Sequence, residues 1–179
     1  SLQDFINLLK QSSGLGIAAI GQTLVIMTGG IDLCLGSIIT LVHVVTIGSM
    51  NGNPLLIVPV CLAGLAIGGI TGFVNGFGVS KAKIAPLIMT LCSDFILRGL
   101  FMIYTKGQPK GVLAESFRSM GRLRIFGFIP LSVIIWLLLS ALFIFIVRRT
   151  TFGAKIKMIG ANPACSRLSG VRNDRVIIL

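Results

Sequence analysis

Acidic side chains are scarce in this chain of 179 residues, which has 5 Asp and Glu against 16 Lys and Arg. Charged residues of both signs together make up 12% of the sequence, whereas an average globular protein has roughly a quarter. Hydrophobic residues make up 54%, and the mean hydropathy is +0.97. This balance excludes an ordinary water-soluble domain, because too few polar side chains are present to cover its surface.

Residues that carry metal, disulfide or acid–base chemistry are also few. The chain has one histidine, His43, and its four cysteines form no CxxC pair. Three of these cysteines lie inside apolar runs, where a thiol behaves as a small hydrophobe. The sequence contains no HExxH motif, no Ser/His/Asp set and no phosphate-binding G-x-x-x-x-G-K-[ST] loop. We therefore expect no disulfide, no metal site and no cofactor in this chain, and we expect His43 to pack and hydrogen-bond rather than to catalyse.

The net charge of +11 does not indicate a nucleic-acid partner. The basic residues are mostly confined to short stretches between apolar blocks, without zinc-ligand spacing, an RNP-like aromatic motif or a helix-turn-helix context. In a membrane protein such stretches set the orientation and contact membrane lipid. We therefore expect lipid as a partner and no nucleic acid.

Long apolar blocks dominate the sequence and predict transmembrane helices. About 20 apolar residues are needed to cross a bilayer as a helix, and a helix satisfies its own backbone hydrogen bonds there. We predict an all-α, multi-span helical membrane protein with a broken helix, and we expect residues 1–179 to be part of a single transmembrane domain. The expected apolar spans cover residues 14–50 with a break near 28–36, 55–79, 84–104 and 128–147.

The loops between these blocks predict an orientation. Residues 148–175 form the most basic stretch, and the positive-inside rule makes it a cytoplasmic loop. Residues 105–127 are then outside, and this connection is long enough to hold a short surface helix. It is also basic, which opposes the predicted orientation without reversing it.

The two ends of the chain resemble cut ends. Residue 1 is Ser, and residues 176–179 look like the opening turn of another apolar segment. We therefore expect the chain to be a fragment of a longer protein.

Small and charged residues inside the apolar blocks predict helix contacts. Glycine recurs every four residues along the third block, which aligns it on one helix face and lets another helix approach closely. We predict a packing seam there, with a sliding surface used in transport as the alternative, formed by Gly64, Gly68, Gly72 and Gly76. Asp94 and Arg98 stand four residues apart, the spacing of neighbours on one helix face, and predict an intramembrane ion pair.

Asp32 is the most informative polar residue of the first block. An ionisable group at membrane depth is costly and normally faces a cavity or a partner. Asp32 follows Gly29 and Gly30, which can break the helix, and broken helices often mark transporter binding sites. It is therefore a candidate for lining a translocation path, or alternatively a helix cap or part of an interfacial turn. Asn75 is either cross-helix glue or a lining of the path.

A short helix is predicted inside the basic stretch. Asn162 is a good N-cap, Pro163 suits the first helical position, and Gly170 suits the position just past the C-terminus. This helix would either lie on anionic headgroups through its arginines or dock to a soluble partner.

Several segments, taken together and in order, resemble one family. Residues 21–37, GQTLVIMTGGIDLCLGS, look like the signature of ribose/xylose-type permease subunits of bacterial ABC importers. Further similar segments are GFVNG (72–76), IAPLIMTL (84–91), RGL (98–100) with GQP (107–109), RRTTFG (148–153), IGAN (159–162) and LSGV (168–171). The chain departs from the usual family residues at Cys34, Asp94 and Ala161.

The resemblance implies a multi-pass permease subunit of the bacterial inner membrane that moves sugars without changing them covalently. It also implies three partners, namely a second permease copy or homologue, an extracytoplasmic sugar-binding protein and cytoplasmic ABC ATPase subunits, which would bind the ATP. Candidates for the translocation path are Asp32, Asn75 and Gln22. Candidates for an ATPase coupling helix are Asn162, Pro163, Arg167, Leu168, Ser169 and Gly170. A membrane-embedded enzyme and a passive structural membrane subunit are the alternatives.

Overall fold

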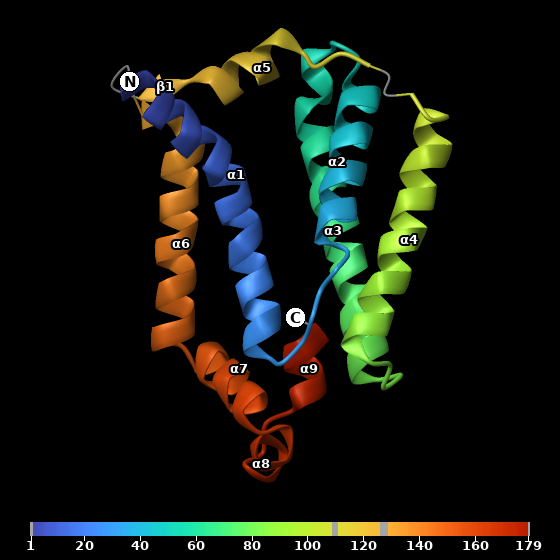
Figure 1. Cartoon of the computed structure of the whole chain (residues 1–179), viewed down its shortest axis with the longest axis vertical. Coiled ribbons are helices and arrows are strands. Elements are labelled where there is room, and N and C mark those ends of the chain that lie inside the picture. The colour runs from blue at the N-terminus through green and yellow to red at the C-terminus, as the bar shows by residue number, and fades with distance from the viewer. Residues whose placement is uncertain (1, 109–110, 126–128, 179) are drawn as a thin grey trace. The chain divides into compact units, whose positions relative to one another are not determined.

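The computed structural model describes residues 2–108, 111–125 and 129–178. Its elements in chain order are α1 (Leu2–Met27), α2 (Leu35–Met50), the 3-10 turn η1 (Pro54–Leu56), α3 (Ile57–Ser80), α4 (Pro86–Thr105), α5 (Glu115–Arg122), β1 (Arg124–Ile125), β2 (Ile129–Pro130), α6 (Leu131–Arg149), α7 (Thr151–Ala161), α8 (Pro163–Leu168) and α9 (Asn173–Ile178) (Figure 1). The two short strands pair antiparallel. Seven residues that entered the sequence arguments lie outside the described residues, namely Ser1, Pro109, Lys110, Phe126, Gly127, Phe128 and Leu179.

Three helices in this part of the chain are long and apolar enough to cross a membrane: Pro54–Ser80, Pro86–Thr105 and Leu131–Arg149. Only 6% of the apolar window is buried inside the protein in the first and third helices, and 22% in the second. Such exposed apolar surface suits lipid and would be unfavourable in water. α2 is also apolar but has 16 residues, fewer than the about 20 that an unbroken span needs. The predicted all-α, multi-span membrane fold is confirmed.

The predicted helix break lies between α1 and α2. α1 begins at Leu2, well before the apolar block, and ends at Met27. The next turn is closed by Thr28 and Gly29, and Gly29 has a φ of 81°, which favours glycine. α2 begins only at Leu35, so the backbone between the two helices is not helical.

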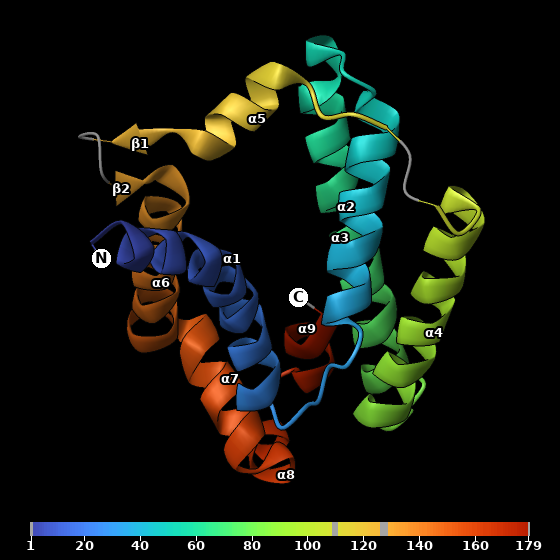
Figure 2. The same ribbon diagram turned by 45° about the horizontal axis from the view of Figure 1, so that its top comes forward.

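One compact unit comprises the chain up to Gly29 and residues 119–173. Within it α1 packs against α6 and α7, and α1 and α6 lie side by side in both views (Figure 1 and Figure 2). Gly16 of α1 faces the indole ring of Trp136 on α6, and Gly160 of α7 faces the carbonyl oxygen of Met27. A side chain at either glycine would overlap its neighbour, so the small residues permit the close approach of these helices.

The other compact unit comprises residues 30–118 and the chain from Asp174 onward. In this unit α2 packs against both α3 and α4, which also contact each other. One apolar core surrounds Cys34, Leu41 and Leu97, and a second surrounds Met50, Val60 and Ala114. The short helix expected between residues 105 and 127 is present as α5, which has no buried residue.

Candidate functional site

The helix break is fixed by short-range and long-range hydrogen bonds. The backbone N–H of Cys34 donates to Oδ1 of Asp32 at 2.8 Å, which is an Asx-type turn just before α2. From α4, the hydroxyl of Thr90 donates to the carbonyl oxygen of Ile31 at 3.2 Å. Asp32 therefore forms a turn at the entry into α2, whose N-cap residue is Cys34. Its place in a translocation path stays a prediction.

A buried polar cluster lies beside the break, where α2, α3 and α4 meet. We define it as Cys34, Ser37, Asn75, Ser93 and Asp94, each of which is at most 8% exposed when backbone and side chain are taken together. The amide nitrogen of Asn75 donates to Sγ of Cys34 at 3.1 Å. The hydroxyl of Ser93 donates to the amide oxygen of Asn75 at 2.5 Å. The nitrogen and the oxygen of the Asn75 amide thus both have a hydrogen-bond partner outside α3, one just before α2 and one on α4.

The carboxylate of Asp94 forms the second half of the buried polar cluster. The hydroxyl of Ser37 on α2 donates to Oδ1, and Nε of Arg98 lies 2.8 Å from Oδ2, one helical turn along α4. The Arg98 side chain is 61% exposed while that of Asp94 is 9% exposed. A buried carboxylate therefore keeps a charged partner at the edge of the unit, which lowers the cost of burying it.

The predicted path residues are distributed over the two compact units. Asp32 and Asn75 belong to the same unit and are separated by Cys34, which hydrogen-bonds to both. Gln22 is half-buried on α1 and belongs to the other unit. Sequence reasoning missed Cys34, Ser37 and Ser93 as members of the cluster, since each is a small side chain in an apolar run.

The glycines of α3 differ in what they face. An added Cβ at Gly76 would lie 2.8 Å from Cα of Ile178 and 2.9 Å from the carbonyl oxygen of Ile177, both on α9. At Gly64 it would lie 3.0 Å from a methyl group of Val42 on α2. At Gly68 and Gly72 it would meet nothing within 4 Å in the described chain. Close contact is therefore concentrated at the two ends of the predicted seam.

The helix predicted in the basic stretch is present as α8. Oδ1 of Asn162 accepts the backbone N–H groups of Ala164 and Cys165 at 2.9 and 3.1 Å. Pro163 is the first helical residue, and Gly170 adopts a φ of 81° just past the end. The local helix signature is confirmed, while the coupling role of Arg167, Leu168 and Ser169 stays a prediction.

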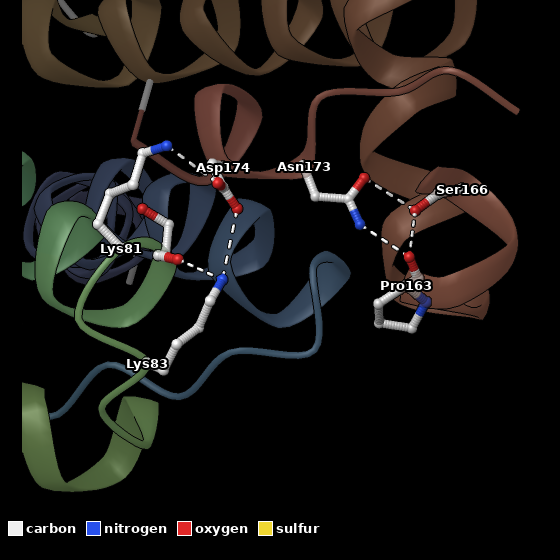
Figure 3. Close-up of polar contacts among 7 residues, drawn as sticks. Lys81, Lys83, Pro163, Ser166, Asn173 and Asp174 are labelled. Carbon is white, nitrogen blue, oxygen red and sulfur yellow. Dashed lines mark hydrogen bonds and ion pairs between the residues drawn. The ribbon is translucent and has the colours of Figure 1, made fainter. Parts of the chain in front are cut away.

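One buried hydroxyl anchors α8 and leaves the rest of the helix exposed. The hydroxyl of Ser166 bonds to Oδ1 of Asn173 at 2.9 Å, and Nδ2 of Asn173 donates to the carbonyl oxygen of Pro163 at 2.9 Å (Figure 3). Leu168 is 89% exposed, and Arg167 is exposed beside it. The outer face of α8 therefore offers an apolar side chain next to a guanidinium group, and arginine is enriched at protein interfaces.

The carboxylate of Asp174 forms ion pairs with both lysines of the loop between α3 and α4. Nζ of Lys81 lies 3.1 Å from Oδ2, and Nζ of Lys83 lies 3.6 Å from Oδ1 (Figure 3). The hydrogen bond from Lys81 is the main cause that holds the pKa of Asp174 below its usual range, and the charge of Lys83 adds to it. We call these three residues the lysine clasp. Asp174 is the only acidic residue between positions 148 and 175, which was the one sequence signal for this contact.

The chemistry that these groups can perform is hydrogen bonding and charge pairing. Within the described residues, no group of three or more His, Cys, Asp or Glu side chains is placed to hold a metal ion. The buried polar cluster offers hydroxyl, amide, thiol and carboxylate groups at the depth of apolar helices. Such groups can bind a polar solute when they exchange their internal partners for it.

Known proteins similar to this chain are transport permeases. The family model described as "Branched-chain amino acid transport system / permease component" matches residues 5–179. The ribose import permease protein RbsC of Haemophilus influenzae is 33% identical over 98% of this chain and 55% of its own length. The RbsC protein of Escherichia coli K12 is 34% identical over 100% of this chain and 56% of its own length. The L-arabinose transport system permease protein AraH of Escherichia coli K12 is 38% identical over 92% and 49%.

These matches cover the chain far better than they cover the relatives. The chain spans about half the length of the curated relatives it matches. No solved structure matches the chain. The similarity is therefore one of sequence, and it includes both units of the structure.

Proposed function

The chain belongs to the family of permease components of branched-chain amino acid transport systems, and we propose that, within this family, it forms part of the membrane-spanning subunit of an ATP-driven sugar importer. The observation that carries the proposal is the identity of 33 to 38% to permeases named for ribose and L-arabinose, over 92% or more of this chain. The exposed apolar helices support a place in a membrane with several spans, and the similarity to bacterial permeases supports the bacterial inner membrane.

The path for the sugar includes Asp32 and Asn75. A sugar presents many hydroxyl groups and needs hydrogen-bonding partners at membrane depth, where lipid supplies none. The buried polar cluster provides such partners beside a helix break, the kind of position at which transporters bind solutes. Movement of the surrounding helices would expose these groups by turns to the two sides of the membrane. Gln22 is a third candidate that rests on the sequence alone.

The energy comes from a separate ATPase chain that binds the ATP. α8 is the element that contacts this chain, because its single buried residue anchors it from behind while Arg167 and Leu168 face outward. The segment 148–175 is then cytoplasmic, as its basic residues predict. The remaining partners are a second permease copy or homologue and an extracytoplasmic sugar-binding protein.

The test is transport by the full-length protein in proteoliposomes, together with its ATPase and its binding protein. Radiolabelled ribose, arabinose and xylose are offered singly, with leucine as the competing solute class that the family description names. Uptake of a sugar that requires ATP supports the proposal. Uptake of leucine without uptake of any sugar would overturn the assignment of sugar as the substrate, while the function as a permease would stand.

The coupling role of α8 is tested by Arg167→Glu. We expect uptake to fall while the permease still inserts, because the reversed charge disturbs the docking surface. The matched control is Arg172→Glu, which reverses an exposed charge in the same basic stretch but outside α8. Equal uptake in both variants and in the unmodified protein would overturn the docking role of α8.

A further inference from the structure

The chain passes between its two compact units after Gly29, after Arg118 and at the peptide bond that joins Asn173 to Asp174, and the last of these crossings lies between two anchored residues. Each of these residues is anchored within its own unit. Asn173 is 3% exposed and makes two hydrogen bonds to the first turn and the centre of α8. Asp174 holds the lysine clasp at the end of α3. The residue that holds α8, Asn173, is therefore directly followed by the residue that holds the α3–α4 loop, Asp174, with no residue between them.

The lysine clasp is tied to α3 by more than one contact. Lys83, which adopts a φ of 57°, donates from Nζ to the carbonyl oxygen of Ser80 at 2.5 Å. It thus caps the C-terminal end of α3, where a cation is favoured by the helix dipole, while its charge also faces Asp174. Lys81 follows Ser80 directly in the chain. A displacement of Asp174 would therefore act on the end of α3 through both lysines.

A second contact connects the same segment to α3 closer to the buried polar cluster. The backbone of Ile177 and Ile178 lies against Gly76, at a distance that leaves no room for a side chain. The residue before Gly76 is Asn75, whose amide holds Cys34 beside the helix break. Continuous contacts thus lead from the clasp and α9, along α3, to the polar groups of the candidate path.

The small contribution of the clasp to stability argues against a purely structural role. The side chains of Lys81, Lys83 and Asp174 are 52%, 62% and 34% exposed. Ion pairs of this exposure contribute little to stability, because water and salt screen them. They can nevertheless fix the position of one segment on another, since one carboxylate faces two cations from the same loop.

We propose that Asn173 and Asp174 form a two-residue linkage that transmits movement of α8 to α3, and thereby couples ATP hydrolysis to opening of the polar cluster. The inference rests on the proposed function, because it takes α8 as the element that the ATPase moves. Asp174, Lys81 and Lys83 are positioning residues in this scheme. They touch neither the sugar nor the ATP.

The experiment measures two rates in the reconstituted importer: ATP hydrolysis stimulated by the loaded binding protein, and sugar uptake. Asp174→Asn keeps the shape of the side chain and removes its charge. We expect it to retain ATPase binding and stimulated hydrolysis but to lower the sugar transported per ATP by roughly five-fold, the low end of typical coupling effects. The charge swap Lys81→Asp with Asp174→Lys, made together with Lys83→Gln so that no cation faces the new lysine, should recover most of this ratio.

The control variant is Glu115→Gln, which removes another exposed ion pair, to Arg118 on α5, and should leave the ratio unchanged. If Asp174→Asn reduces insertion, the double variant Lys81→Gln with Lys83→Gln removes the clasp from the other side and is expected to uncouple in the same way. An unchanged ratio in an inserted clasp variant overturns the linkage. A fall of the ratio that the charge swap does not recover also overturns it, since the pairing would not be the cause. If the ATPase does not bind the unmodified permease at all, the proposed function fails instead.

Discussion

Asn75 holds the end of the helix break through a hydrogen bond to Cys34, a residue 41 positions earlier in the chain. The same amide accepts the hydroxyl of Ser93 on α4. One side chain on α3 therefore joins the start of α2 to the middle of α4.

Asn75→Ala should weaken this junction. The change removes both hydrogen bonds and leaves a cavity, and we expect a loss of about 1 kcal/mol in the free energy of unfolding, measured by thermal unfolding in detergent. Thr71→Val is the control on the same helix, because within the described part of the chain the Thr71 hydroxyl donates to the carbonyl oxygen of Ile67 in its own helix and to no other helix. Equal stability of the two variants would show that the cross-helix bonds carry no extra stability.

Asp94 and Arg98 should behave as a coupled pair. Arg98→Gln leaves a buried carboxylate with the Ser37 hydroxyl but without its charged partner, and we expect it to destabilise the protein more than the double change Asp94→Asn with Arg98→Gln does. The measurement is a double-mutant cycle on the melting temperature. A coupling free energy of about 0.5 kcal/mol or more is expected, and strictly additive effects would contradict the pairing.

Local signals in the sequence account for what could be predicted. The apolar blocks predicted the helices that could span a membrane. Asn162, Pro163 and Gly170 predicted where α8 begins and ends. α1, however, begins at Leu2 rather than near residue 14, because polar residues that lower hydropathy do not stop a helix. For the same reason the basic stretch 148–175 holds the helix α7, which hydropathy alone did not indicate.

The contacts that build the candidate site were beyond sequence reasoning. Ser37 and Asp94 are 57 residues apart, and Lys81 and Asp174 are 93 apart. Helical periodicity predicts which residues share a face of one helix, as it did for Asp94 and Arg98, but not which helices meet. A small polar residue such as Cys34 or Ser93 gives no sign of its partner until the helices are placed.

The contribution of Asp174 to stability should depend on pH in one direction only. The two lysines hold the pKa of its carboxyl below the ordinary value of 3.8, so the folded protein keeps the charge where the unfolded chain would begin to take up a proton. The stabilisation is therefore complete above pH 3.8 and is lost as the pH falls through the lowered folded value. We expect the difference in melting temperature between the unmodified protein and Asp174→Asn to be constant near neutral pH and to shrink below pH 3.8. A difference that grows on acidification would contradict the ion pairing.

Gly76 and Gly72 offer the sharpest comparison, because they stand one turn apart on the same helix and differ in what lies beside them. A methyl group at Gly76 would press on the backbone of α9, at 2.8 Å from Cα of Ile178, and backbone cannot rotate away as a side chain can. At Gly72 the same methyl group would meet nothing within 4 Å in the described chain.

We expect Gly72→Ala to stabilise α3 by about 0.5–1 kcal/mol through helix propensity, and Gly76→Ala to destabilise the protein and to increase hydrogen exchange in residues 174–178. Because the last segment connects the lysine clasp to α3, Gly76→Ala should also lower the sugar transported per ATP, whereas Gly72→Ala should not. Identical exchange in both variants would show that α9 does not rest on Gly76.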